Sequence, residues 1–264
     1  RIDYSILDQH AESYRKIRNT FRYLLGNLND SFEDENLEKV NIENLPELEK
    51  FMLHKIYNLN LNFTKYFNNY DFHNLYKELL NFCTVDLSAF YFDIRKDTLY
   101  CDPKDSKKRK STLLVLNIIL NSLLKWFAPI LSFTTEEIYQ LISKKKKSIH
   151  LEKFLNFPKK FENLKLNNKW LKLLRIRDIC NLSIEEKRAS KEIGSSLEAS
   201  LILKISKKDA EIVNEIDLSE LCITSSVEIR KNDSDDIVVK TLRAKGDKCP
   251  VCWKISPNPC MRHG

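Results

Sequence analysis

The residues with the clearest potential for chemistry lie in the last sixteen positions of this 264-residue chain. Cys249 and Cys252 are separated by two residues, and Cys260 and His263 repeat that spacing after seven intervening residues. Two such pairs can each clasp one metal ion through a tight turn, and three thiolates with one imidazole make a closed tetrahedral zinc site. The sequence therefore predicts one structural zinc ion with no open position for catalysis. Free thiols and redox pairing are the alternatives.

An aromatic residue directly follows the first cysteine pair in a basic setting. Trp253 has Lys248, Lys254 and Arg262 as near neighbours in the sequence. Such a ring is suited to stacking on an unpaired base. It could equally pack the metal-binding tail against the preceding structure.

A second candidate surface lies near the start of the chain. Apolar residues recur every three or four positions between Leu7 and Leu28, which predicts an amphipathic helix. On the opposite face, four residues follow the i, i+3, i+4, i+7 pattern of one helical ridge. These residues are Arg15, Arg18, Asn19 and Arg22. We call them the basic ridge; its amide could read a base edge or could simply be a surface group.

Positive charge is concentrated rather than spread evenly. The net charge is only +7, but residues 144–177 hold twelve basic and two acidic side chains, and residues 240–264 hold six basic and one acidic. Such clustering favours a polyanionic partner, nucleic acid first and an anionic membrane second. A solvated lysine-rich surface is the plainer alternative.

Composition favours a folded, mainly helical protein. Hydrophobic residues make up 42% of the chain, and only 4 residues are Gly, which argues against Gly-rich phosphate loops and turn-dense β architectures. The first 19 residues lack the apolar core of a signal peptide, and the 7 cysteines fit reduced thiols plus a metal site. We therefore expect a cytoplasmic protein.

The apolar stretch 113–131 is the best candidate for a membrane span. Asn117, Asn121 and Lys125 fall four residues apart in it and so share one helix face. This pattern predicts a core helix with a polar stripe and no membrane contact.

The periodicity predicts five helices in a bundle over residues 1–143. The strongest start signal is a capping box of Thr134 and Glu137, with Phe133 and Ile138 as a hydrophobic staple. A basic connector and a long helix follow over residues 144–198, then a small β-α-β-β unit over 199–245 and the zinc-binding tail over 246–264. The predicted fold class is mainly α: a helical bundle, then a small α+β unit and a zinc-binding knuckle.

Signatures of enzymatic chemistry are missing from these residues. The sequence contains no nucleophile elbow, no His-Glu-x-x-His helix and no phosphate-binding Walker loop. The histidines before residue 263 are isolated from one another. We therefore predict no catalytic residue.

Several segments, in order along the chain, resemble the C-terminal part of bacterial-type isoleucyl-tRNA synthetases. The most specific is Cys249-Pro-Val-Cys-Trp253; helical motifs shared more loosely with the leucyl, valyl and methionyl enzymes precede it. The other segments are residues 14–28, 90–100, 124–139, 184–199 and 242–248. The tail departs from the family's usual pattern of two Cys-x-x-Cys pairs that lie farther apart, because here the second pair ends in His263.

The resemblance implies a module that recognises the anticodon stem and loop of isoleucine tRNA. In that reading, phosphates meet the basic ridge and unpaired bases meet aromatic and amide groups. The tRNA-binding candidates are Arg15, Arg18, Asn19, Arg22, Lys187, Arg188, Lys248 and Trp253. Arg188 could instead pair with Glu185, three residues before it.

The resemblance also implies a larger, monomeric ligase. The nucleotide-binding catalytic domain that would use ATP, and the editing domain, are not in these 264 residues, so we expect this part alone to be inactive in aminoacylation. Two other hypotheses remain: a stand-alone zinc-containing DNA-binding regulator, and a purely structural helical scaffold.

Overall fold

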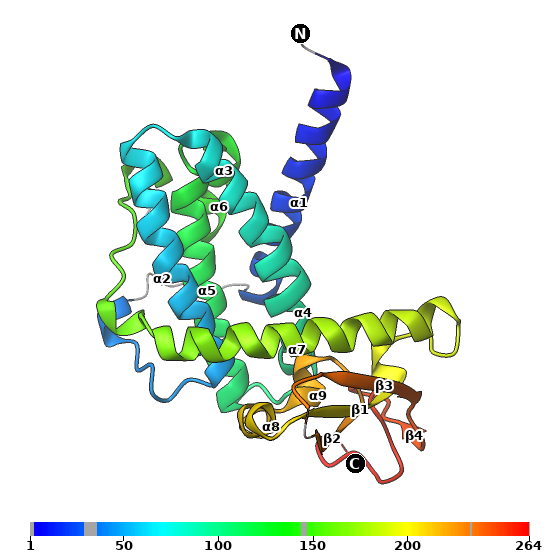
Figure 1. The fold of residues 1–264 in the computed structure, drawn as a ribbon. Coiled ribbons are helices and arrows are strands. Elements are labelled where there is room, and N and C mark those ends of the chain that lie inside the picture. The colour runs from blue at the N-terminus through cyan, green and yellow to red at the C-terminus, as the bar shows by residue number, and fades with distance from the viewer. Residues whose placement is uncertain (1–2, 29–35, 144–146, 233, 264) are drawn as a thin grey trace. The chain divides into compact units, whose positions relative to one another are not determined.

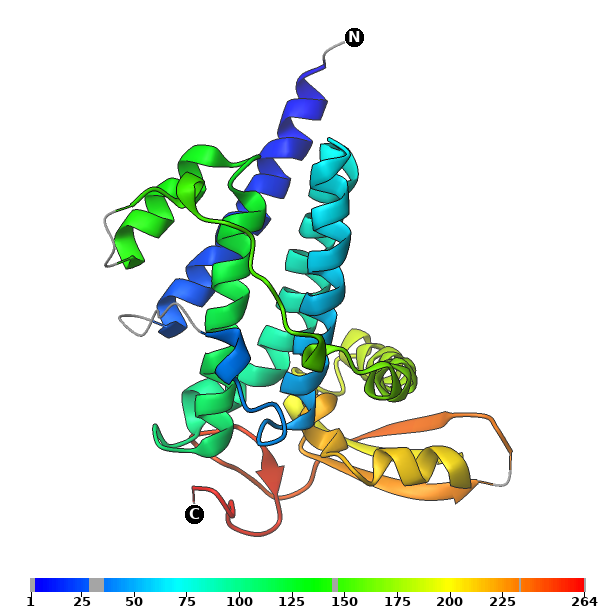
Figure 2. The same cartoon turned by 90° about the vertical axis from the view of Figure 1, so that its left-hand side faces the viewer.

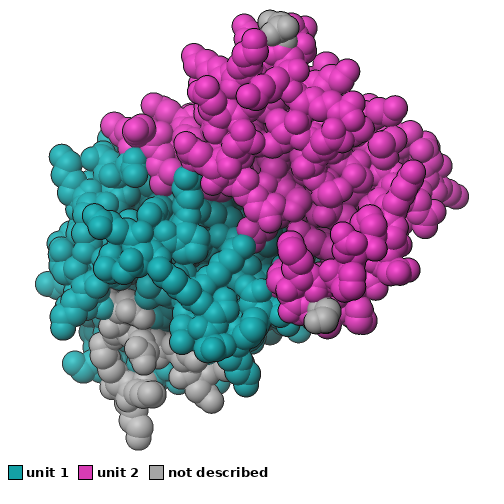
Figure 3. Space-filling view, turned by 90° about the horizontal axis from the view of Figure 1, so that it is seen from below, with its two compact units in different colours: residues 1–163 teal, residues 164–264 magenta. Residues whose placement is uncertain are grey.

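The computed structural model describes residues 3–28, 36–143, 147–232 and 234–263, and Figures 1 and 2 show it from two sides. The chain divides into two compact units, residues 1–163 and 164–264, coloured teal and magenta in Figure 3. We refer to them as unit 1 and unit 2. Part of the predicted basic connector, residues 144–146, lies outside the described residues.

Unit 1 is built from helices, as the sequence predicted, but its described residues up to 143 form six α-helices and one π-helix where five helices were predicted. Its elements are α1 (Tyr4–Leu28), η2 (Leu37–Lys39), α2 (Glu47–Asn68), α3 (Phe72–Asn81), η3 (Phe82–Phe92), α4 (Asp93–Cys101), α5 (Lys107–Phe127), α6 (Ser132–Ile142), η4 (Ile149–Leu151) and η5 (Lys159–Phe161). Together with the small sheet of unit 2, this confirms the mainly α fold class.

The predicted apolar stripe of α1 is buried only in its second half. Ile17, Phe21 and Leu24 are at most 1% exposed, whereas Leu7 is 54% exposed. The first turns of the helix extend past the other helices of unit 1 (Figure 1). The periodicity therefore predicted the helix correctly but could not show where its core contacts end.

Helix α5 runs through the interior of unit 1. Ser106 caps its start by accepting a hydrogen bond from the Arg109 amide at 3.3 Å. The predicted polar stripe is itself buried, since Asn117, Asn121 and Lys125 are each at most 7% exposed. Among the described residues, none of the helices is both long and apolar enough to cross a membrane.

The predicted capping box and staple of α6 are wrong. The helix begins at Ser132 without a side-chain cap, and the Thr134 hydroxyl instead lies 2.9 Å from the hydroxyl of Tyr14 on α1. Phe133 is 93% exposed and so cannot act as a staple. The Thr134 side chain, which the local sequence predicted as a helix cap, instead forms a tertiary hydrogen bond with Tyr14.

A buried ion pair joins α2 to α4. Glu49 accepts hydrogen bonds from Nε and Nη2 of Arg95, both at 2.6 Å. The hydroxyls of Tyr91 and Thr112 donate to the same carboxylate at 3.2 and 3.1 Å. Four donors therefore satisfy a carboxylate that is 0% exposed.

Unit 2 combines a long helix with a three-stranded sheet. Its elements are α7 (Leu164–Ala189), η6 (Ser196–Glu198), β1 (Ala199–Ser206), α8 (Lys207–Val213), α9 (Leu218–Leu221), β2 (Ser226–Asn232), β3 (Val238–Arg243), β4 (Asp247–Lys248) and β5 (Ile255–Ser256). The order is β2-β1-β3, with β1 parallel to β2 and antiparallel to β3. The predicted β-α-β-β unit is thus present, with the short helix α9 added before its second strand.

Helices cover one face of this sheet. Helix α7 packs on β3, and α8 lies along β1 and β2 (Figure 2). The side chains of β1 that point to this face are buried, including Leu201, Leu203 and Ile205. On β3, Thr241 shares a hydrogen bond of 2.7 Å with Ser183 of α7. The alternate positions of each strand point the other way.

Candidate functional site

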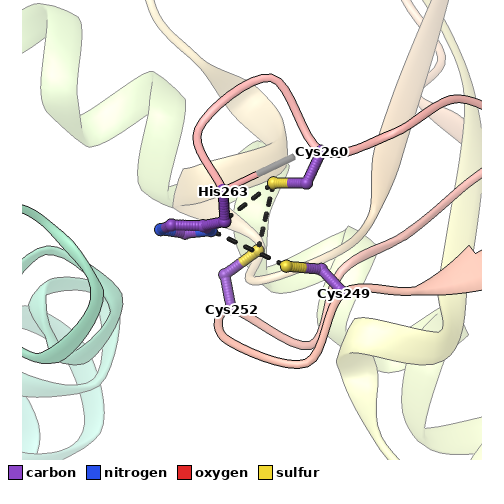
Figure 4. A group of neighbouring side chains, drawn as sticks. All are labelled: Cys249, Cys252, Cys260 and His263. Carbon is purple, nitrogen blue, oxygen red and sulfur yellow. Dashed lines mark hydrogen bonds between the residues drawn. The ribbon is translucent and has the colours of Figure 1, made fainter.

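The tail of unit 2 brings together the four residues that the sequence predicted as metal ligands. The Sγ atoms of Cys249, Cys252 and Cys260 and one ring nitrogen of His263 all lie within 4.8 Å of one another. Figure 4 shows the four side chains converging from two turns of the tail. The Sγ atoms of Cys252 and Cys260 are 3.8 Å apart, and Nδ1 of His263 lies 3.6 Å from Cys249 Sγ and 3.5 Å from Cys260 Sγ.

These separations match the edges of a small coordination tetrahedron. With Zn–S bonds of about 2.3 Å and a Zn–N bond of about 2.05 Å, tetrahedral angles place two sulfurs about 3.8 Å apart and a sulfur and a nitrogen about 3.6 Å apart. Three of the six separations among the ligand atoms therefore fit such a tetrahedron, and all six lie within 4.8 Å. All four positions would be filled by protein, so no position would be open for a substrate.

Each ligand pair sits in a turn whose backbone amides face a sulfur atom. Amide hydrogen bonds from Cys252 and Val251 lower the pKa of the Cys249 thiol to about 6. Those from Arg262 and His263 lower the pKa of Cys260. Burial raises the pKa of Cys252, to about 11. Two of the three thiols are thus stabilised as thiolates, the form that binds metal.

A short hairpin places the first turn. Strands β4 and β5 pair Asp247 with Ser256, and the amide of Cys249 donates to the Lys254 carbonyl at 2.9 Å. Gly246 precedes the hairpin with φ +114°, and a Cβ on it would lie 2.2 Å from the Ser256 backbone. Only glycine fits there.

The hairpin is also anchored to the rest of unit 2. The amide of Ile255 donates to the Ser225 hydroxyl at 2.7 Å, and Nζ of Lys254 donates to the Ser219 hydroxyl at 3.2 Å. Our sequence reasoning missed Ser219, Ser225 and Gly246. No local pattern marks the two serines, because their partners lie 30 or more residues away.

Trp253 presents its ring to solvent beside the metal cluster. The residue has φ +63° and is 59% exposed, and its amide donates to the Cys249 carbonyl at 3.0 Å. Nζ of Lys248 lies 5.2 Å from the ring centroid, within cation–π range. The exposure favours a ring available to a ligand over one that packs the tail onto the sheet.

The basic ridge on α1 is exposed at all four of its positions. Its members differ in their partners. The guanidinium of Arg15 is held by Glu12, one turn earlier, at 2.6 Å. Arg18 and Arg22 therefore offer the ridge's charge with less competition than Arg15.

The two candidates at the end of α7 are engaged with neighbouring acids. Arg188 pairs with Glu185 at 2.6 Å, as the spacing of three residues suggested. Nζ of Lys187 lies 2.8 Å from both carboxylate oxygens of Glu192. Lys248 and Trp253 belong to the same tail as the four candidate metal ligands, whereas Lys187 and Arg188 lie at the end of α7.

Comparison with known proteins gives a consistent family assignment. A family profile described as the anticodon-binding domain of tRNA ligase matches residues 49–203. An isoleucine-tRNA ligase of Pelagibacter ubique is 66% identical over 263 residues, which cover 100% of this chain and 29% of the ligase. Isoleucine-tRNA ligases of Bartonella quintana and Petrotoga mobilis are 39% and 38% identical over 97% and 98% of this chain. The chain spans under a third of the length of these relatives.

Proposed function

Because this chain belongs to the family of anticodon-binding domains of tRNA ligases, we propose that it is the tRNA-recognising part of an isoleucine-tRNA ligase. In the longer polypeptide, a catalytic domain would use ATP to attach isoleucine to the tRNA that this part holds. The editing domain would belong to the same polypeptide. We further propose that the ligase acts as a monomer in the cytoplasm.

One observation carries this proposal. The similarity to an isoleucine-tRNA ligase extends over 100% of the chain, so it includes both the helical domain and the metal-binding tail. The exposed residues are chemically suited to RNA. Guanidinium groups on α1 can bind phosphates, and the Trp253 ring can stack on an unpaired base.

The ligand geometry supports zinc as the metal. Three sulfurs and one imidazole nitrogen within 4.8 Å of one another are the donor set typical of structural zinc sites. Bound zinc would fix the fold of the tail. Cys249, Cys252, Cys260 and His263 would hold it, and the two turns would then fix the position of the Trp253 ring. The proposed role of the metal is therefore positioning rather than catalysis.

The test measures binding of this chain to isoleucine tRNA and to a version with an altered anticodon, each at two salt concentrations. Zinc content is determined on the same sample. We expect the native anticodon to bind more tightly, affinity to fall with salt, and one zinc per chain. This chain without the rest of the ligase should show no aminoacylation.

Three results would contradict the proposal. Equal binding of both tRNAs would remove anticodon recognition, and equal affinity for duplex DNA would favour a DNA-binding regulator. Absence of RNA binding altogether would favour a structural scaffold. A sample that is folded but contains no zinc would contradict the metal assignment alone.

A further inference from the structure

The three-stranded sheet of unit 2 has one face that the helices of this unit leave uncovered. On the central strand β1, Ser200, Ile202 and Lys204 alternate with the buried side chains and point to this open face. The residues of β2 and β3 that pair with these three positions point to the same face. Where all three strands pair, the open face comprises Ser200, Ile202, Lys204, Ser226, Glu228, Arg230, Val238, Lys240 and Leu242.

Exposure confirms this assignment of faces. Glu228, Arg230 and Lys240 are exposed, and Val238 and Leu242 are 49% and 40% exposed. Thr241 lies between two of these residues on β3 and points to the opposite, covered face. It is buried and shares a hydrogen bond with Ser183 of α7. Within unit 2, the open face is therefore a surface that the helices leave exposed.

Basic side chains cross the open face from strand to strand. Lys204 lies directly opposite Arg230 of β2 in register. Lys240 of β3 lies opposite Ile202, which is two residues before Lys204 on β1. Lys240 is therefore a diagonal neighbour of Lys204 on the same face. Neighbouring strands are about 4.8 Å apart and two residues span about 6.6 Å along a strand, so the Cα atoms of the three residues lie within about 12 Å of one another. We call Lys204, Arg230 and Lys240 the cationic row.

This arrangement works against the stability of the sheet. Like charges directly opposite one another on a sheet repel, whereas opposite charges there would attract. Among the nine side chains of the open face, Glu228 is the one acid, and it already binds Arg230 at 2.7 Å. The row thus keeps an excess of positive charge that an anionic partner would neutralise.

We propose that the open face of this sheet binds the phosphate backbone of RNA, with Lys204, Arg230 and Lys240 as its contacts. This inference rests on the proposed tRNA-binding function and assigns it a second surface, apart from the basic ridge and Trp253. None of the nine side chains is aromatic, so the face has no platform for stacking bases. The face is complementary to the negative charge of the RNA phosphates. It would therefore increase RNA affinity and orient the RNA, but it would not distinguish one base sequence from another.

The test compares tRNA binding by the double variant Lys204→Gln/Lys240→Gln with that by Lys207→Gln/Lys208→Gln. The control removes two exposed lysines of the same unit from α8, so both variants lose the same net charge. Binding of isoleucine tRNA is measured across a series of salt concentrations. Thermal unfolding of each variant shows that the fold is kept.

We expect the sheet variant to bind more weakly and with a shallower salt dependence. Each lost phosphate contact lowers the slope of log K against log salt by about 0.7 to 0.9, so two contacts lower it by about 1.4 to 1.8. The preference for the native anticodon should not change, since phosphate contacts carry no sequence information. The α8 control should retain the slope of the unchanged chain.

The outcomes separate this inference from the proposed function. If the unchanged chain prefers the native anticodon but both double variants behave alike, the open face is not an RNA surface and the proposed function stands. If the sheet variant alone loses affinity but the unchanged chain shows no anticodon preference, the open face stands and anticodon recognition fails. If the unchanged chain binds no RNA, both are overturned.

Discussion

Glu49 of α2 and Arg95 of α4 form a two-point ion pair in the interior of unit 1, with side chains 0% and 3% exposed. The two residues are 46 positions apart in the sequence, and their pairing ties α2 to α4. Removing one member of a buried pair leaves an uncompensated charge, which typically costs about 3–5 kcal/mol.

We therefore predict that Arg95→Met destabilises the chain by about 3–5 kcal/mol. Urea unfolding followed by circular dichroism measures the change. The matched control is Arg188→Met, which breaks the exposed pair with Glu185 and should cost less than about 1 kcal/mol. Equal effects of the two substitutions would show that the buried carboxylate gains little from its partner.

His54 should make the stability of the chain depend on pH. It is 1% exposed, and its Nδ1 accepts a hydrogen bond from the Asn163 amide at 2.9 Å. Burial lowers its pKa below the usual value near 6.5. As pH falls through 6.5, the unfolded chain takes up a proton that folded His54 resists, so stability falls with decreasing pH.

The measurement is the free energy of unfolding at pH 7.5 and pH 5.0 for the unchanged chain and two variants. His54→Gln should reduce the loss of stability between these pH values. His10→Gln, at an exposed position on α1, should leave that loss as it is. If both variants lose as much stability as the unchanged chain, other groups account for the pH dependence.

Within the basic ridge, Arg18 should contribute more to tRNA binding than Arg15. Glu12 already holds the Arg15 guanidinium, so an RNA phosphate must compete with that carboxylate. We expect Arg18→Gln to weaken binding and reduce the salt slope by about 1, and Arg15→Gln to have a smaller effect. Titration of both variants with isoleucine tRNA decides the order, and a larger loss for Arg15→Gln would contradict it.

Trp253 should stack on an unpaired base of the tRNA. Replacing an aromatic platform by alanine typically costs about 1–3 kcal/mol per stacked base, and we expect a loss in that range for Trp253→Ala. Trp253→Phe retains a ring and should keep most of the affinity. Binding is compared at one salt concentration with zinc content checked in each variant. A phenylalanine variant as weak as the alanine variant would argue against stacking.

Loss of a ligand should unfold the metal-binding tail without unfolding unit 1. We expect Cys249→Ser to abolish stoichiometric zinc, and treatment of the unchanged chain with a strong chelator to act likewise. Cys101→Ser replaces a partly buried thiol of α4 that lies outside the cluster, and should keep the zinc. Metal analysis and limited proteolysis report on the two variants. Retention of one zinc by Cys249→Ser would remove this residue from the ligand set.

Local patterns predicted the features whose determinants are close in sequence. The apolar spacing located α1, and the repeated Cys-x-x spacing picked out four side chains that the fold brings together, because each turn is made within four residues. The start of α6 failed for the opposite reason. Its expected cap, Thr134, bonds to Tyr14, 120 residues earlier, and no local signal could reveal that partner.

The same distinction explains the other features that sequence reasoning did not identify. Glu49 and Arg95 look like any two charged helix residues until the fold brings them together. The cationic row depends on strand register, which fixes which side chains of β1, β2 and β3 share a face. Counting charged residues along the sequence shows which segments are basic, but it does not show which basic side chains share one face of the sheet.

The π-helix η3 makes the number of residues in its segment critical. It joins α3 to α4 in one continuous helical run, and its i→i+5 pattern holds one more residue per hydrogen-bonded turn than an α-helix does. Deletion of a single codon within residues 82–92 would turn α4 by roughly a quarter turn about the helix axis relative to α3. Arg95 would then point away from Glu49. In the evolution of the gene, this segment should therefore resist the insertion or deletion of single codons.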